Sequence, residues 1–435
     1  MTISVLRFSG LALGGAVLAA AWATPTFAQE TQQQDGQAQA DRPLFDRGNN
    51  ESVRERERPE FDPLGAPLGA FRLYPSAGFG IGHTDNIFAT ETNADEDSYI
   101  DATAAAVLAS QWSRHGLRLS ADVNHREFAD FDEESATTWG AGVEGRVDIL
   151  RGTQAFATFA TREGREGRGV NDPNGLAELI EVNTERATLG VSREAGRLRM
   201  RIEGELYTAD FDDARLRPGG FADQDFRDEE ARTLRGRVDM AISPDTALFA
   251  SASQTQREFD DAVGGLVRDF DTTDALIGAS FDLSQLLRGE IGLGYVWSTY
   301  DSQVLDDVEG FSGASVLEWF PSQLTTVRLD LRRGIAPAGV LDAAAVTRTD
   351  VALAVDHELR RNIILGGQVG YVRGEYEELD REDSVTRYAV TGDWLVNRVA
   401  TLNARVERRE QESEGVSRGR TFDVTEFAVS ATLRR

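Results

Sequence analysis

The side chains best suited to binding chemistry are arginines and carboxylates that alternate with apolar residues in many short stretches. Between residues 198 and 206, the even positions are apolar or glycine and the odd positions are Arg199, Arg201, Glu203 and Glu205. Guanidinium forks bind carboxylate and sulfate groups through paired hydrogen bonds, so such a face could line a route for an acidic glycan. The same charges could instead pair across neighbouring strands and satisfy a wet interior, which is the interpretation we favour.

The residues expected on this charged face all fall on the polar side of an alternating stretch. They are Arg118, Arg126, Arg146, Arg199, Arg201, Glu203, Glu205, Arg235, Arg237, Arg328, Asp330, Arg332, Arg405 and Glu407.

Other kinds of chemistry find little support in the sequence. It has no cysteine, and its four histidines lack the spacing of metal ligands, so we expect no metal and no cofactor. An outer-membrane barrel enzyme would need a histidine beside acidic residues, and only His83 with Asp85 offers that combination. We therefore predict no catalytic residues and no enzymatic activity.

The alternating charges must be carried by strands with one apolar and one polar face. The links between these strands are alternately short and long, as in outer-membrane barrels with tight periplasmic turns and long extracellular loops. The apolar face is also rich in small residues such as Ala102, Ala104 and Ala106, whereas a soluble sandwich would need larger ones to fill its core. We predict an all-β, transmembrane, antiparallel up-and-down barrel of about 18 strands, within a range of roughly 16 to 18.

Aromatic placement supports a membrane-spanning barrel. Trp112, Trp319 and Trp394 fall at or beside predicted short turns, whereas Trp139 and Trp297 fall at the loop ends of their strands. Tryptophan gathers at the two membrane interfaces, so these residues are expected to form two girdles.

The N-terminal region predicts export from the cytoplasm. Residues 1–28 carry a single charge, Arg7, and an apolar stretch that ends in small residues up to Ala28, which is typical of a signal peptide. A single-span anchor is the alternative, but a spanning helix needs roughly 20 apolar residues. Residues 29–70 contain few large apolar residues and are expected to form a disordered periplasmic tail. Residues 71–435 would then be the barrel.

The net charge of −27 argues against a nucleic-acid partner, and it arises largely from acidic residues in the predicted loops. Nucleic-acid phosphates select basic surfaces, so no nucleic-acid partner is expected. Much of the acid lies in predicted loops, where we expect a solvated rim at the cell surface. Calcium binding is the alternative, but no loop shows the full spacing of a defined calcium loop.

Two segments of the sequence resemble a known family. Residues 69–75 end in Pro75, which suits the first residues of a strand, and Asp85, Asn86 and Phe88 follow as an Asp-Asn-x-Phe signature. These features resemble the entry into the barrel of the putative β-barrel porin 2 family, and the resemblance runs from about residue 58 to the end. It implies an outer-membrane barrel of Gram-negative bacteria, in many cases associated with exopolysaccharide export, with no established catalytic residues.

Together, the charged face and the resemblance predict a bacterial outer-membrane pore. It would take part in export of an extracellular, acidic polysaccharide, with lipid, lipopolysaccharide, the polysaccharide and periplasmic export machinery as partners. A general diffusion porin for small solutes is the alternative. The oligomeric state stays open.

Overall fold

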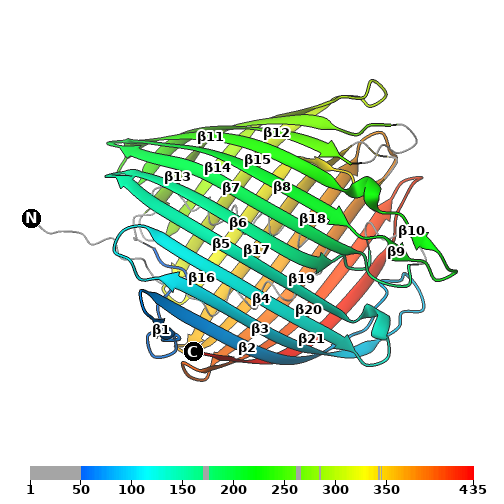
Figure 1. Ribbon diagram of the computed structural model, residues 1–435, viewed down its shortest axis with the longest axis horizontal. Coiled ribbons are helices and arrows are strands. Elements are labelled where there is room, and N and C mark those ends of the chain that lie inside the picture. The colour runs from blue at the N-terminus through cyan, green and yellow to red at the C-terminus, as the bar shows by residue number, and fades with distance from the viewer. Residues whose placement is uncertain (1–49, 170–175, 261–265, 284–285, 341–342, 344) are drawn as a thin grey trace, which may run out of the picture.

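The computed structural model describes residues 50–169, 176–260, 266–283, 286–340, 343 and 345–435, which form a closed antiparallel barrel (Figure 1). The predicted signal peptide, and residues 29–49 of the predicted tail, lie outside the described residues. No helix in the described part of the chain is long and apolar enough to cross a membrane.

The barrel wall has the predicted number of strands, 18 in the described residues. They are β2 (Phe71–Thr84), β3 (Asp97–Ser110), β4 (Gly116–Phe128), β5 (Ala136–Leu150), β6 (Thr153–Arg165), β7 (Glu181–Ala195), β8 (Leu198–Phe211), β11 (Glu229–Ser243), β12 (Thr246–Phe259), β13 (Phe270–Leu283), β14 (Leu287–Tyr300), β15 (Val308–Ser322), β16 (Thr325–Pro337), β17 (Ala345–Arg360), β18 (Ile363–Tyr376), β19 (Glu382–Leu395), β20 (Ala400–Glu414) and β21 (Phe422–Arg434).

Each wall strand pairs with its neighbours along the chain, and β21 returns to β2 to close the barrel. Closure removes the free sheet edges that could not be satisfied in lipid. The short elements outside the wall are β1 (Ala66–Leu68), β9 (Ala214–Arg215), β10 (Phe221–Ala222) and two 3-10 turns, Asp132–Glu134 and Asp225–Arg227.

The strands have the two faces that the alternation predicts. Ile277 and Phe311 are 71% and 78% exposed on the outer face, which suits contact with lipid. Asp274 is three residues from Ile277 on β13 and so lies on the opposite, inner face, where it is paired in register with Ser253 of β12. The inner face is therefore polar and the outer face apolar.

The tryptophans are spaced as two interface girdles would require. Trp297 lies opposite Glu309 in the β14–β15 register, and Trp319 lies ten residues beyond Glu309 on the same face of β15. At about 3.3 Å per residue on a strand tilted by about 40°, that separation spans roughly 25 Å, the height of the apolar band of outer-membrane barrels.

For residues 50–70 the structure differs from the predicted disordered tail. This segment lies at the short-turn end of the barrel, where β1 pairs with the start of β2 (Figure 1, lower left). Val53 and Arg58 are only 1% and 3% exposed. The segment needs no core of its own, because ion pairs and hydrogen bonds to the barrel wall hold it in place.

Candidate functional site in the barrel lumen

The structure places the predicted charged residues on the inner face of the wall. On β8, Arg201 and Glu203 flank the outward Ile202, which is 56% exposed. The same alternation places all the other members of the set inward: Arg118, Arg126, Arg146, Arg199, Glu205, Arg235, Arg237, Arg328, Asp330, Arg332, Arg405 and Glu407.

Many inward arginines pair with the carboxylate two positions further along the same strand. Residues i and i+2 of a strand share a face, so an Arg-x-Asp or Arg-x-Glu sequence forms such a pair within one strand. The N–O distances are 2.6 to 3.2 Å in the following pairs: Arg146–Asp148, Arg201–Glu203, Arg237–Asp239, Arg328–Asp330 and Arg348–Asp350. Arg381, just before β19, pairs with Asp383 of that strand at 2.6 Å.

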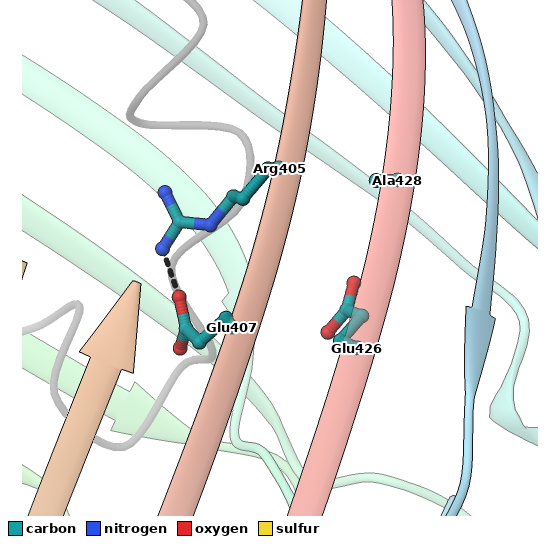
Figure 2. Close-up of a pocket in the computed structure, with 4 residues that line it drawn as sticks. All are labelled: Arg405, Glu407, Glu426 and Ala428. Carbon is teal, nitrogen blue, oxygen red and sulfur yellow. Dashed lines mark hydrogen bonds and ion pairs between the residues drawn. The ribbon is translucent and has the colours of Figure 1, made fainter. Parts of the chain in front are cut away.

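Figure 2 shows another such pair, Arg405 with Glu407 on β20, beside Glu426 of β21. The sequence predicted pairing between strands, and the structure adds this second pattern along each strand.

Other ion pairs connect these groups between different strands of the wall. Arg237 on β11 also bridges to Glu290 on β14 at 2.6 Å, and Arg126 on β4 reaches Glu426 on β21 at 3.2 Å. Arg118 is an exception, because it forms no ion pair with any residue in the described part of the chain, although Glu144 lies opposite in register.

Several inward arginines also stack on aromatic rings. The guanidinium carbons of Arg126, Arg201 and Arg237 lie 3.9, 4.4 and 4.0 Å from the ring centroids of Tyr99, Phe156 and Phe249. A stacked face and paired edges hold each guanidinium in one orientation. The alternation predicts that these aromatics face inward, but it does not predict which arginine each of them meets.

The Asp-Asn-x-Phe signature fastens the first long loop to the last strand. Asp85 Oδ1 accepts a hydrogen bond from the backbone N–H of Thr425 at 2.6 Å. The Asn86 amide donates to the carbonyls of Thr90 and Asp423 at 2.8 and 2.9 Å and is almost fully buried. Because Asp423 and Thr425 belong to β21, the signature secures the β2–β21 seam at the long-loop end.

Phe88 of the same signature joins four long loops at the outer mouth. Its ring packs edge-on to Phe131 at 4.9 Å, and the guanidinium of Arg217 lies 4.6 Å from the ring centroid. Arg168 approaches the same ring at 6.0 Å, and Arg420 donates to the Phe88 carbonyl at 3.2 Å. These residues come from four different inter-strand loops, so Phe88 ties the loops together above the lumen.

The start of the β6–β7 loop leans across the outer mouth. Arg409 of β20 donates to the carbonyl of Arg168 at 3.2 Å, although β20 is six pairings from β6 around the wall (β6–β5–β4–β3–β2–β21–β20). A buried ion pair joins Arg168 to Glu134, and another joins Glu166 to Arg227. The loop is therefore braced from three sides.

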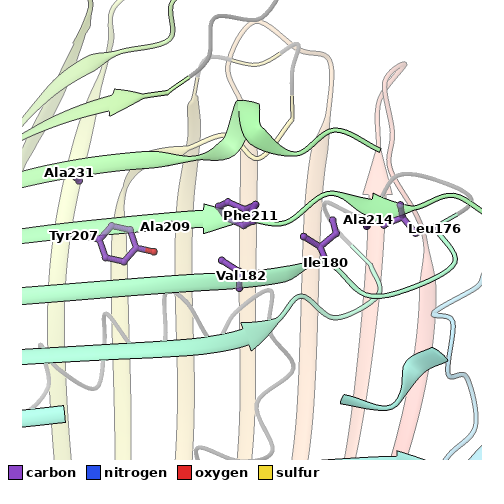
Figure 3. Close-up of a cluster of buried hydrophobic side chains, with 8 residues drawn as sticks. All are labelled: Leu176, Ile180, Val182, Tyr207, Ala209, Phe211, Ala214 and Ala231. Carbon is purple, nitrogen blue, oxygen red and sulfur yellow. The ribbon is translucent and has the colours of Figure 1, made fainter. Parts of the chain in front are cut away.

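An apolar cluster supports this end of the wall (Figure 3). Inward residues of β7, β8 and β11 pack against residues of the two neighbouring loops; the cluster consists of Leu176, Ile180, Val182, Tyr207, Ala209, Phe211, Ala214 and Ala231. It fixes the loops on the lumen side of the rim.

Replacing Asn86 with alanine should loosen the outer mouth. The change removes the amide donor of the Thr90 and Asp423 carbonyls and the acceptor of the Thr90 N–H, a loss of about 0.5 to 1.5 kcal/mol for each hydrogen bond. Hydrogen exchange of the amides of residues 85–96 should become faster, while that of the short turns stays unchanged. Thr92→Ala, in the same exposed loop, is the matched control. Equal exchange in both variants would contradict the role given to Asn86.

The outer loops also gather carboxylates. Asp213, Asp223 and Asp225 each present an oxygen within 4.8 Å of the others and are exposed. Burial, together with the neighbouring carboxylates of Asp210, Asp225 and Asp260, raises the pKa of the nearby Asp228 to about 6. Exposed acidic groups of this kind are common without an ion, so the cluster is not assigned as a metal site.

Comparison with known proteins gives a family and a fold. No curated protein matches the sequence. Three solved outer-membrane structures share its general shape: PirA, a siderophore receptor of Pseudomonas aeruginosa (10% identity, TM-score 0.43, covering 83% of this chain and 80% of PirA), OccK1 of the same species (11%, 0.45, 83% and 99%) and the FrpB iron transporter of Neisseria meningitidis (9%, 0.48, 81% and 62%). These values describe a shared general shape and nothing more specific.

The family comparison covers most of the chain. The model of the putative β-barrel porin 2 family matches residues 58–435, from Arg58 before the first strand to the end of the last strand. The match includes every wall strand and the signature at Asp85, Asn86 and Phe88. The chain therefore belongs to the putative β-barrel porin 2 family and is an outer-membrane β-barrel porin.

Proposed function

We propose that this porin is a gated pore for export of an acidic extracellular polysaccharide. The observation that carries the proposal is that segments of the chain itself lie across both mouths of the barrel. Residues 166–168 lean over the outer mouth, and residues 50–58 occupy the inner one. A pore that conducted small solutes at all times would gain nothing from such segments, whereas an export pore must stay closed between transport events.

The paired arginines suit an acidic polymer. Each guanidinium already has a carboxylate partner in the wall, so a passing carboxylate or sulfate competes for it instead of binding an isolated charge. Transport requires binding that is strong enough for entry and weak enough for release. The stacked orientation of Arg126, Arg201 and Arg237 holds their hydrogen-bonding edges in a fixed direction, in which a cargo carboxylate could replace a wall carboxylate.

A general diffusion pore is the second candidate. The observation that favours it is the pairing of lumen charges itself, because a water-filled interior of any porin is satisfied in the same way. The two candidates differ in what they predict for conduction and for the cell surface.

Single-channel recording with sugar probes separates the two candidates. Oligogalacturonate should interrupt the current at concentrations on the order of tenfold lower than a neutral maltodextrin of equal length, because only the acidic probe can pair with the arginines. Deletion of the gene should also remove the surface polysaccharide, and the intact gene should restore it. A steady conductance, equal effects of the two probes and an unchanged cell surface would support the diffusion pore instead.

A further inference from the structure

Residues 50–62, here called the inlet strap, lie along the inner mouth of the barrel. Their sequence includes an alternating run of charges from Glu51 to Arg58. Arg54 forms ion pairs with Asp356 at 2.7 Å and Asp393 at 3.1 Å. The run therefore has a defined binding site on the wall.

Three further charged side chains of the strap, Glu55, Arg56 and Arg58, are paired in the same way. Arg56 and Arg58 both contact Glu358 at 3.0 Å, and Glu55 contacts Arg288 at 2.6 Å. Arg288 in turn pairs with Glu318. The charges of the strap and of the wall are thus complementary at Arg54, Glu55, Arg56 and Arg58.

The carboxylates that receive the strap form an acidic arc on one side of the wall. The arc lies between β13 and β19 and consists of Asp282, Asp356, Glu358 and Asp393. Asp282 accepts a hydrogen bond from the Asn50 amide, which extends the match to the first described residue. The arc covers about a third of the circumference of the barrel.

The backbone of the strap is held by side chains of the short turns. Arg361 donates to the Glu57 carbonyl at 2.9 Å, and Arg398 donates to the Pro59 carbonyl at 2.7 Å. No residue of the strap pairs with a wall strand in a β-ladder; among the described residues, the pairing begins only at Ala66 of β1. The strap can therefore leave the wall without breaking any of the strand pairing that closes the barrel.

We propose that the inlet strap is a displaceable plug, and that the acidic arc is a binding site for an extended, arginine-rich segment that the strap fills in the closed pore. Its attachment is largely ionic, and Arg54 keeps 39% of its side chain exposed, so salt and competing charges weaken the Arg54 pairs, whereas the Arg58–Glu358 pair is buried. The inference rests on the proposed function, since it names how that pore is gated.

A disulfide lock tests the plug directly, because the chain has no cysteine of its own. The backbone N–H of Val53 donates to Thr326 Oγ1 at 2.9 Å, so the two residues are neighbours, and non-reducing electrophoresis first verifies that Val53→Cys/Thr326→Cys forms the disulfide. In planar bilayers the oxidised full-length protein should stay closed, and dithiothreitol should restore openings. The single variants Val53→Cys and Thr326→Cys should not respond to dithiothreitol. Equal open probability of the oxidised and reduced double variant would overturn the proposal.

Charge reversal provides an independent test that needs no crosslink. Arg54→Glu/Arg56→Glu/Arg58→Glu should raise the ratio of open to closed time on the order of tenfold, since each lost pair contributes a factor of a few. The matched control Arg114→Glu/Arg151→Glu/Arg197→Glu makes the same charge change in short turns that do not touch the strap. An equal rise in the control would overturn the proposal.

The outcomes also separate the plug from the proposed cargo. If the lock has no effect while oligogalacturonate still interrupts the current and gene deletion removes the polysaccharide, the plug is wrong and the export function stands. If the lock closes the pore but both sugar probes act equally and the cell surface is unchanged, the plug stands and the export function is wrong.

Discussion

Replacing Arg237 with alanine is expected to destabilise the barrel by about 3 to 5 kcal/mol, because it removes the cation from a buried group of charges. Asp239, which is 0% exposed, and Glu290 both depend on this guanidinium, at 2.8 and 2.6 Å. The substitution would also remove the stacking of the Arg237 guanidinium on the Phe249 ring. Two largely desolvated carboxylates would then lose the cation that they share.

Urea-induced unfolding from lipid vesicles measures this loss. Arg232→Ala is the matched control, because Arg232 lies on the same strand and also pairs with a carboxylate two positions away, but its side chain is 52% exposed. The control should lose less than about 1 kcal/mol. Neutralising the partners in Arg237→Ala/Asp239→Asn/Glu290→Gln should recover most of the stability. Equal losses in Arg237→Ala and Arg232→Ala would contradict the assignment of a buried charge group.

The sequence was sufficient to predict the barrel because its signals are local. Polar and apolar residues alternate with period 2 within a strand, as in Arg199 to Glu205. The lengths of the connections indicate which end faces the periplasm. The strand number follows from length divided by the residues needed per strand. Family membership rests on a short signature at Asp85, Asn86 and Phe88 and is confirmed by the match over residues 58–435.

The inlet strap could not be predicted, because its partners are remote in sequence. Arg54 and Asp356 are separated by 302 positions, and nothing near Arg54 indicates which carboxylate it meets. The segment has few large apolar residues, which is the composition of a disordered tail. It is ordered because the closed barrel supplies the carboxylates and the buried surroundings that it lacks.

The same reasoning applies to the outer mouth. The signature residue Phe88 was visible in the sequence, but its contacts with Phe131 and Arg217 depend on loops from different parts of the chain. Period and spacing fix where a side chain points within one strand. They do not fix where a long loop or a terminal segment lies, and the segments across the two mouths of this barrel are of that second kind.

Replacing Arg199 and Arg201 with alanine is expected to make the pore more selective for cations. Both side chains face the lumen, and Arg201 balances Glu203 at 2.6 Å, so the double variant leaves excess negative charge there. A unit charge about 7 Å from a passing ion in water contributes about 0.6 kcal/mol, close to RT, so each lost arginine should change ion occupancy roughly threefold before screening.

Reversal potentials in a potassium chloride gradient measure this change, and dilute solutions are preferable because salt screens lumen charges. The matched control is Arg193→Ala/Arg232→Ala, which removes two positive charges from the outer face, where Arg193 lies opposite Met200 and Arg232 opposite Leu206. Only the lumen variant should shift the reversal potential toward that of potassium. If both variants retain the wild-type value, this pair of arginines does not line the conduction pathway, and their pairing with Glu194 and Glu203 serves only the stability of the wall.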